Sequence, residues 1–371
     1  MRRFCLRSLL PVSATILAGD WQMSSSPLGF RRGTYALAAA AAFILTACSE
    51  NATTSPSKAI APGSASLDQS PEFNDPSGHG HVLHTKQWFE NAGNAHGHGP
   101  GGGGTSTGIS YHGGPVLQAG TKVVAVYWAA SAIYSGGPTP GTHDAGSADG
   151  SLVGFFLRNL GGSPYFNINS TYTDGSGRNI VNSISYTAYW ANNIGVPGNG
   201  QSVSDAAMVA MLQSGFNSGA LTYDPNTLYA IFTAGTVNLG GGFGTQYCAY
   251  HTHGTVSVSG GSKTVLYAAM PYDNAYPGSC TNGTIAPNGD PGADAEVNTL
   301  AHETEETTTD MMGTAWFDTR GYENADKCAW TWGTTHTASN GGLYNITIGG
   351  KPFLVQQNWV NNGTGGCLQA W

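Results

Sequence analysis

The part of the chain that is richest in chemically active side chains is AHETEETTTD, residues 301–310. Only 10% of the chain is Asp, Glu, Lys or Arg, so this run of acids stands out. It contains HETEE, which has the form H-E-x-x-E, a variant of the H-E-x-x-H helix of zinc peptidases. In that helix two ligands one turn apart hold the metal, and the intervening Glu activates water. We therefore assign His302 and Glu306 as zinc ligands and Glu303 as the general base.

A third ligand is expected from the chain beyond this helix, because a catalytic zinc ion takes three protein ligands. GYENADKC supplies two acids, of which Glu323 is the expected third ligand. Asp326 is the expected neighbour that orients His302. His253 and Tyr322 are candidate donors to the oxyanion that forms when a carbonyl group is attacked. Together these residues predict a zinc-dependent hydrolase, with a peptidase as the favoured class.

Other interpretations of these residues stay open. The acids could form a solvated face, because a surface helix has an apolar and a charged stripe. Against this, Glu side chains at helical spacing repel one another unless a cation lies near them. CAYHTHG holds His251 and His253, which on a strand would point to one side and could bind a metal. A calcium site would use Asp290, Asp294 and Glu296 in NGDPGADAE, although their spacing differs from an EF-hand loop.

The elements that position these residues alternate along residues 109–371, which we assign to one globular domain. Four apolar, β-rich runs predict strands: TKVVAVYW, SISYTAYW, TLYAIFTA and TVLYAAMPY. ADGSLVGFFLRNL and SVSDAAMVAMLQSGF have apolar residues at helical spacing, and Ser202 or Ser204 is the expected N-cap of the second. The H-E-x-x-E helix is expected to have Asp294 near its start and Gly313 as its stop. This order predicts an α/β or α+β fold, a mixed β-sheet with packed helices that include a zincin-like active helix.

Composition and charge narrow the class of protein. The chain has 371 residues, 54 glycines and a net charge of -8. A nucleic-acid-binding protein needs a basic face that displaces counterions, so this composition argues against nucleic acid as a partner. Few charges with many Gly, Ser, Thr and Asn residues are typical of an extracytoplasmic protein with long loops. We expect its substrate to be a peptide or a cell-wall component.

The N-terminus predicts export. FRRGTYALAAAAAFILTACSE runs from two arginines through an apolar stretch to small residues, which is the layout of a secretory signal. The apolar stretch is too short for a comfortable membrane span. Leu-Thr-Ala-Cys resembles a bacterial lipobox, so we assign residues 1–48 to a signal peptide and Cys48 to lipidation, with the lipid as the sole membrane anchor. Met23 is then a candidate start, and an ordinary cleavable signal is the alternative.

Residues 49–108 are rich in Gly, Ser and His and have little apolar periodicity, so we assign them to a disordered linker. The tracts HGHVLH and HGH within it could bind transition metals weakly, although a polar tether that carries histidines is the simpler interpretation. Whether this linker is a removable propeptide stays open.

Beyond Cys48 the chain has four cysteines. An even number in an exported protein predicts two disulfides, for which three connectivities are open. We favour Cys248 with Cys280 and Cys328 with Cys367, because each pairing closes a loop within one region. A zinc site is the alternative, but the four cysteines lack the close pairs that structural zinc sites use.

Several short motifs follow one another between residues 109 and 371: YHGGPVL, VVAVYW, CAYHTHG, PGSC, VNTLA, ADKC and GGKPFLVQQNWVNNGTGGC. In this order they resemble the phosphate-induced EXORDIUM-like family of secreted proteins, known chiefly from plant cell walls. The resemblance implies a secreted single domain with a stabilising C-terminal Cys and no established enzymatic activity. It implies no metal site, because the plant members carry largely apolar or small residues where this chain has LAHETEETTTD.

Two functions follow from these observations. The first is an exported, lipid-anchored EXORDIUM-like protein that acts as a zinc-dependent hydrolase. The alternative is a non-catalytic protein of the cell surface or cell wall, which binds glycans or peptides by stacking them on exposed Trp and Tyr rings.

Overall fold

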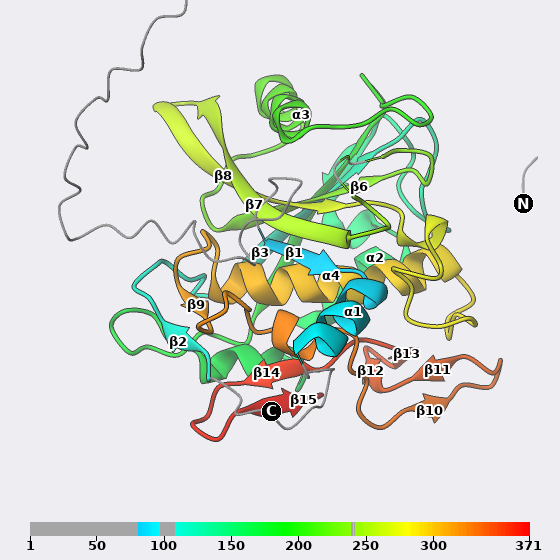
Figure 1. Cartoon of the computed structure of the whole chain (residues 1–371). Helices are drawn as coiled ribbons and strands as arrows, with labels where there is room; N and C mark the ends of the chain where they lie inside the picture. Colours follow the sequence, from blue (N-terminus) through cyan, green and yellow to red (C-terminus); the bar gives the residue numbers. More distant parts are fainter. Residues whose placement is uncertain (1–80, 97–107, 239, 241) are drawn as a thin grey trace, which may run out of the picture. The chain divides into compact units, whose positions relative to one another are not determined.

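The structure is a computed structural model that describes residues 81–96, 108–238, 240 and 242–371 (Figure 1). These residues belong to one unit of the chain, residues 62–371. The predicted signal peptide, with Met23 and Cys48, lies outside the described residues. Within the described part, every helix is too short or too polar to span a lipid bilayer.

A seven-stranded mixed sheet forms the centre of the fold, in the order β1-β7-β8-β6-β3-β5-β4 (Figure 1). Its strands are β1 (His81–His84), β3 (Thr121–Trp128), β4 (His143–Ala145), β5 (Ile184–Asn192), β6 (Thr227–Thr233), β7 (Tyr247–Val258) and β8 (Gly261–Met270). The four central strands β5, β3, β6 and β8 are parallel, whereas β4, β7 and β1 each pair antiparallel with their neighbours. All four strands predicted from apolar runs are present, and all four are these central parallel strands.

Helices cover both faces of the sheet, which confirms the predicted α/β class. α2 (Leu152–Leu160) and α4 (Pro291–Thr309) pack on one face, and α3 (Asp205–Ser218) packs on the other (Figure 1). The β3 residues that pack with α2 and α4 are Val123, Ala125 and Tyr127, and those that pack with α3 are Val124, Val126 and Trp128. A parallel strand that is covered on both faces is apolar at successive positions, which is why TKVVAVYW was recognisable.

Local capping signals set the helix starts. The Ser151 side chain accepts a hydrogen bond from the Gly154 N–H at the start of α2, and Ser204 caps α3 in the same way. Asp290 is the N-cap of α4 and Pro291 fills the first position, so Asp294 lies in the first turn, near the helix start as predicted. α4 ends at Thr309, four residues before Gly313.

Short elements surround this core. The small two-stranded sheets are formed by β2 (Ser110–Tyr111) with β9 (Trp316–Phe317), β10 (His336–Thr337) with β11 (Leu343–Tyr344), β12 (Ile346–Ile348) with β13 (Lys351–Phe353), and β14 (Asn358–Val360) with β15 (Gly366–Leu368). Short 3-10 helices are η2 (Gly146–Ala148), η3 (Phe166–Thr171), η4 (Asp273–Ala275) and η5 (Asp326–Cys328). The C-terminal pieces pack against α4 on the side away from the sheet, so this helix becomes the interior of the molecule.

Part of the segment predicted to be a linker belongs to the fold. Within residues 49–108, the structure places β1 and the helix α1 (Lys86–His96). β1 pairs antiparallel with the edge of β7, with Val82 opposite Tyr250. The composition of residues 81–84 did not predict a strand, because β1 has only four residues and depends on a partner strand far away in the sequence.

Both predicted disulfides are confirmed. Cys248 bonds to Cys280 and Cys328 bonds to Cys367, with Cα atoms 5.4 and 5.6 Å apart. These bonds are typical of a protein that folds in an oxidising, extracytoplasmic compartment.

Candidate metal centre

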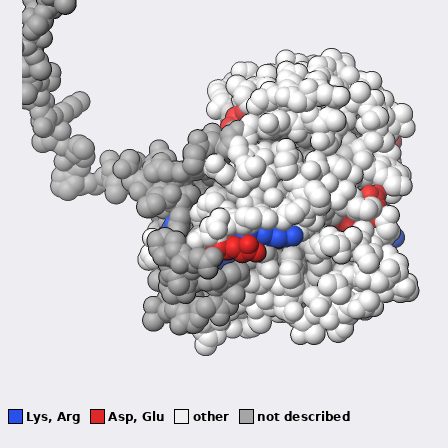
Figure 2. Space-filling model, turned by 45° about the vertical axis from the view of Figure 1, so that its right-hand side comes forward, with Lys and Arg blue, Asp and Glu red and all other residues white. Residues whose placement is uncertain are grey.

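The acid-rich helix α4 is buried along almost its whole length. Every residue from Gly292 to Thr309 is buried, because the sheet covers one side and the C-terminal segment covers the other. The alternative of a solvated acidic face is therefore wrong. Figure 2 shows a molecular face on which charged side chains are sparse, in keeping with acids that lie inside rather than outside.

Two polar stripes run along α4. The stripe that faces the sheet includes Thr299, which donates to the Asp273 carboxylate, and Glu303, which lies against His251 of β7. The stripe that faces the C-terminal segment includes Glu305, whose carboxylate accepts hydrogen bonds from the side-chain amides of Asn169 and Asn358. Glu306 lies where ligand groups from both sides meet, as the distances show.

Two groups of candidate ligand atoms share Glu306. In the first group, His302 Nε2 is 3.0 Å from Glu306 Oε1 and 3.5 Å from Asp326 Oδ1. In the second group, His251 Nδ1 is 3.6 Å from Glu306 Oε2, and His251 Nε2 is 3.6 Å from Glu323 Oε2. Within each group the ligand atoms lie within 4.8 Å of one another, which is close enough for one ion.

The structure brings together the four residues predicted around the ion, which are His302, Glu306, Glu323 and Asp326. It divides them between two ligand groups, however, whereas the sequence predicted one. His302 and Glu306 are adjacent as expected for i and i+4 on a helix. Asp326, predicted to orient His302, is the acid grouped with it, whereas Glu323 is grouped with His251. The alternation of histidines in CAYHTHG was the signal for His251, but the sequence did not show that β7 lies beside α4.

Hydrogen bonds set the proton position on His302. The side-chain nitrogen of Gln356 donates to the Ala325 carbonyl at 2.9 Å and lies 2.8 Å from His302 Nδ1. Because that nitrogen is a donor, Nδ1 is the acceptor and a neutral His302 carries its proton on Nε2. The Nε2–H group then points toward Glu306 and Asp326.

His251 has the opposite arrangement. Its Nδ1 lies 3.2 Å from Glu303 Oε2 and 3.6 Å from Glu306 Oε2, so ionised carboxylates there favour a proton on Nδ1, and burial lowers the pKa of the ring. A neutral His251 therefore has an unprotonated Nε2, which has no hydrogen-bond partner within the described residues. A metal-binding histidine usually donates one ring N–H to a carboxylate and binds the metal through the lone pair of its other ring nitrogen. Glu303 Oε1 is likewise without a hydrogen-bond partner in the described part of the chain.

Burial dominates the proton affinity of the acids. It raises the pKa of Glu303 to about 8 and that of Glu306 to about 7, and the Asp326 carboxylate adds to both shifts. Burial also raises the pKa of Glu323 well above its ordinary range, and repulsion from Glu306 adds to the shift. Burial alone would raise the pKa of Asp326, but the hydrogen bond from His302 lowers it. Carboxylates buried in this way must hold either protons or a cation.

The remaining predicted site residues, His253 and Tyr322, supply no atom to either ligand group. His253 is exposed, two residues beyond the buried His251 on β7. Tyr322 packs near Phe89, and the Arg320 guanidinium lies over its ring at 4.5 Å. Asp310, at the end of α4, accepts backbone hydrogen bonds that close the following turn, and burial raises its pKa to about 6.

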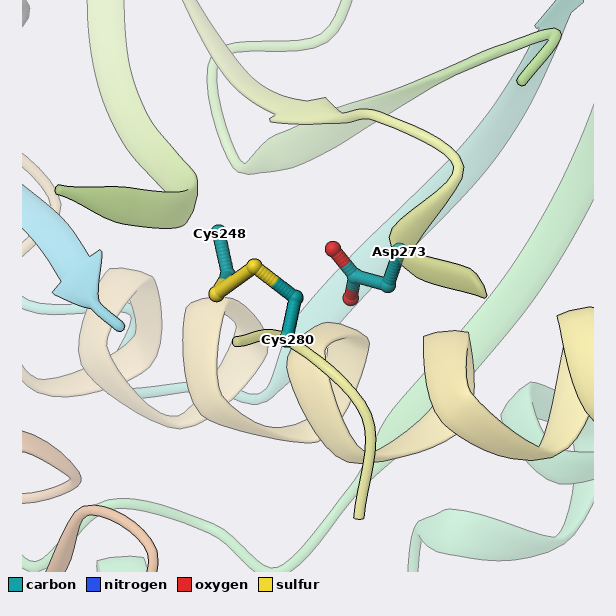
Figure 3. A group of neighbouring side chains, drawn as sticks. All are labelled: Cys248, Asp273 and Cys280. Carbon is teal, nitrogen blue, oxygen red and sulfur yellow. A yellow bond between two sulfur atoms is a disulfide. The ribbon is translucent and has the colours of Figure 1, made fainter. Parts of the chain in front are cut away.

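Two other candidate sites are not metal centres. Cys248, Asp273 and Cys280 are neighbours, but both sulfur atoms are used in a disulfide (Figure 3). The calcium alternative fails because its three acids have separate roles. Asp290 caps α4 and Asp294 binds the Asn288 amide, whereas Glu296 belongs to the buried stripe facing the sheet.

Comparisons with known proteins identify relatives of the chain. The family model described as the phosphate-induced protein 1 conserved region matches residues 162–362. Protein EXORDIUM-like 5 of Arabidopsis thaliana is 24% identical over 292 residues, which cover 68% of this chain and 76% of the relative. No solved structure gives a significant match.

Proposed function

The chain belongs to the phosphate-induced protein 1 family, and we propose that this member is an exported, zinc-dependent hydrolase that cleaves peptide bonds. Anchoring through a lipid on Cys48 is part of the proposal and rests on the lipobox-like sequence. The family membership supplies the fold and the extracytoplasmic setting. The catalytic part of the proposal depends on this chain's own acids and histidines.

The observation that carries the proposal is the convergence of two histidine–acid groups on Glu306 in the interior. Glu303, Glu306 and Glu323 are fully buried, and each keeps a carboxylate oxygen without a hydrogen-bond partner among the described residues. Burying an ionised carboxylate is costly unless it is paired. A divalent cation would offset this cost for several acids at once.

Within this cluster we assign the ion to His251, Glu306 and Glu323. The hydrogen-bond pattern supports this choice, because His251 presents an unprotonated Nε2 whereas the Nε2 of His302 carries a proton. His302 and Asp326 then act as positioning residues, which hold Glu306 from the other side. Zinc fits a donor set of imidazole and carboxylate groups.

Glu303 is the proposed general base. Its Oε2 accepts from His251, which leaves Oε1 able to accept a proton from a water molecule. A bound zinc ion would supply Lewis acidity that lowers the pKa of that water. The water oxygen adds to the peptide carbonyl carbon, Glu303 passes the proton to the amide nitrogen, and the C–N bond breaks to give an acid and an amine.

Metal content of the purified protein tests the proposal. We expect one zinc ion per chain after reconstitution and dialysis, and loss of this ion in Glu306→Gln and in His251→Asn. His302→Asn should keep the ion with about 10–100-fold weaker affinity, because it removes a positioning group. Glu90→Gln, on the exposed face of α1, is the control. A reconstituted wild-type chain without zinc would exclude the hydrolase.

Hydrolysis of an unstructured peptide tests the role of the ion. Glu303→Gln keeps an acceptor for His251 but cannot take up a proton, so we expect zinc to be retained and the rate to fall by about 100-fold or more.

The complete burial of the ligand groups favours a second candidate, a non-catalytic binding protein of the cell surface or cell wall. In that case an ion would only stabilise the interior, and the wild-type chain would bind zinc without cleaving any peptide.

A further inference from the structure

The ligand groups are covered by one short strand. His81 of β1 places its Nδ1 2.9 Å from Glu323 Oε2, and its ring stacks on that of His251 at 5.2 Å. The backbone of Leu83 lies close enough to the Glu303 carboxylate to lower its pKa. Figure 1 shows β1 beside β7 and next to α4. β1 therefore lies against Glu323, a proposed zinc ligand, and against Glu303, the proposed general base.

β1 has the position and the pairing of a bound peptide. It is the outermost strand of the sheet and pairs antiparallel with β7, with His81 opposite His251. Extended peptides bind proteins in this way, by adding a strand to the edge of a sheet. Such a peptide gains main-chain hydrogen bonds from the edge strand, and alternate side chains enter pockets that select among sequences.

The Leu83 side chain fills such a pocket. It is completely buried, in an apolar cluster with the Cys248–Cys280 disulfide, Ala329 and Trp330. The indole N–H of Trp330 donates to the His84 carbonyl at 2.8 Å, which fixes the backbone of β1 beside the pocket. The His81 side chain is 11% exposed, whereas those of His251 and Glu323 are 2% and 0% exposed, so His81 is the one of the three that lies nearest the surface.

We propose that the edge of β7 beside α4 is a binding site for an extended peptide with an apolar residue at the position of Leu83, and that β1 is its internal occupant. The inference rests on the proposed function for its choice of substrate, and it adds a means of regulation. While β1 is paired with β7, a substrate cannot reach Glu303. Displacement or removal of β1 opens the site.

The fraction of chains in which β1 is paired with β7 sets how much more weakly an added peptide binds. A ligand that binds only the open form has its apparent affinity reduced by the fraction of chains that are open. If β1 is displaced in about 1% of chains, a peptide added in solution binds about 100-fold more weakly than it does to a permanently open site.

Peptide binding to two leucine variants tests the proposal. The probe is the fluorescent peptide GHVLHTK, which copies residues 80–86, and the readout is its anisotropy with the full zinc-reconstituted chain. Leu83→Asp would bury a carboxylate in this apolar pocket, so β1 should leave the edge. We expect this variant to bind the probe at least about tenfold more tightly than wild type. The control Leu343→Asp, at a site that is 45% exposed, should bind as wild type does.

A folded Leu83→Asp variant that binds the probe no better than wild type overturns the proposal. If Leu83→Asp does not fold, His81→Ala decides, because it removes the contacts of the His81 ring with Glu323 and His251 and leaves Leu83 in its pocket. Hydrogen exchange at residues 81–84 should become faster in this variant, and unchanged protection again overturns the proposal. Failure of the hydrolase is distinguishable, since a chain that binds the probe without zinc or cleavage keeps the peptide site and loses only the reaction.

Discussion

The buried acids predict that the metal-free protein loses stability as the pH rises. An acid whose pKa is higher in the folded state than in the unfolded state holds its proton longer when folded. Stability is then greatest below the unfolded pKa of about 4.5 and falls until the folded pKa has been passed. For Glu306 and Glu303 the folded values are about 7 and about 8, so the loss continues through neutral pH.

The magnitude follows from these values. Between about pH 6.5 and pH 8.5 the unfolded glutamates are ionised throughout, while the folded protein still holds protons at the lower end. Linkage then gives a loss of about 2 kcal/mol from Glu303 and about 1 kcal/mol from Glu306. Glu305 and Glu323 are shifted in the same direction and add to the loss. His81 and His251 contribute little in this window, because their pKa values are lowered and an unfolded histidine is already mostly neutral. Burial by itself would lower the pKa of His302, but the Glu306 and Asp326 carboxylates raise it well above its ordinary value, so His302 also adds to the loss of stability as the pH rises.

Urea unfolding followed by Trp fluorescence measures this slope, first with a chelator and then with zinc. We expect the free energy of unfolding to fall by about 3 kcal/mol or more across the window in chelator. Zinc should abolish the fall, because a cation takes the place of the protons. Glu303→Gln, which is neutral at every pH, should remove about 2 kcal/mol of the slope, and Glu90→Gln should leave it unchanged. A chelated wild-type protein whose stability stays flat to within about 0.5 kcal/mol would refute the reasoning.

Two further predictions concern the scaffold. Replacing Cys328 and Cys367 together by serine opens the bond that ties η5 to β15, and we expect a loss of about 2–4 kcal/mol in urea unfolding under oxidising conditions. An equal stability of this variant and wild type would contradict the prediction. Asp149→Asn removes the carboxylate that accepts from the Tyr127 and Tyr186 hydroxyls in the core, and should cost about 1–3 kcal/mol in the same assay, whereas a neutral effect would show that the amide serves both donors.

The elements that the sequence predicted correctly are those with local signals. β3 matches TKVVAVYW residue for residue, because a parallel strand covered on both faces is apolar throughout. α3 begins after Ser204, one of the two predicted caps, because a cap acts within one turn of the helix. The disulfide pairs followed from the short distance along the chain between their cysteines.

The site was predictable only as far as it lies on one helix. His302, Glu303 and Glu306 were identified from their spacing, since i and i+4 residues meet wherever a helix forms. The burial of α4 was not predictable, because its sequence is as polar as that of a surface helix and its cover comes from distant segments. The same holds for β1, whose pairing with β7 joins residues far apart in the chain.

Residue types and their order therefore established that the chain carries an acid–histidine helix in a disulfide-bonded α/β domain. Which residues contact that helix was decided by the tertiary structure. His251 of β7 contacts Glu303 and Glu306 of the helix, and also Glu323 in the loop after it. His81, on the strand at the sheet edge, contacts Glu323. Which histidine faces which acid depends on strand pairing and on the hydrogen bonds of residues such as Gln356. These contacts act through space, so neither composition nor spacing along the chain records them.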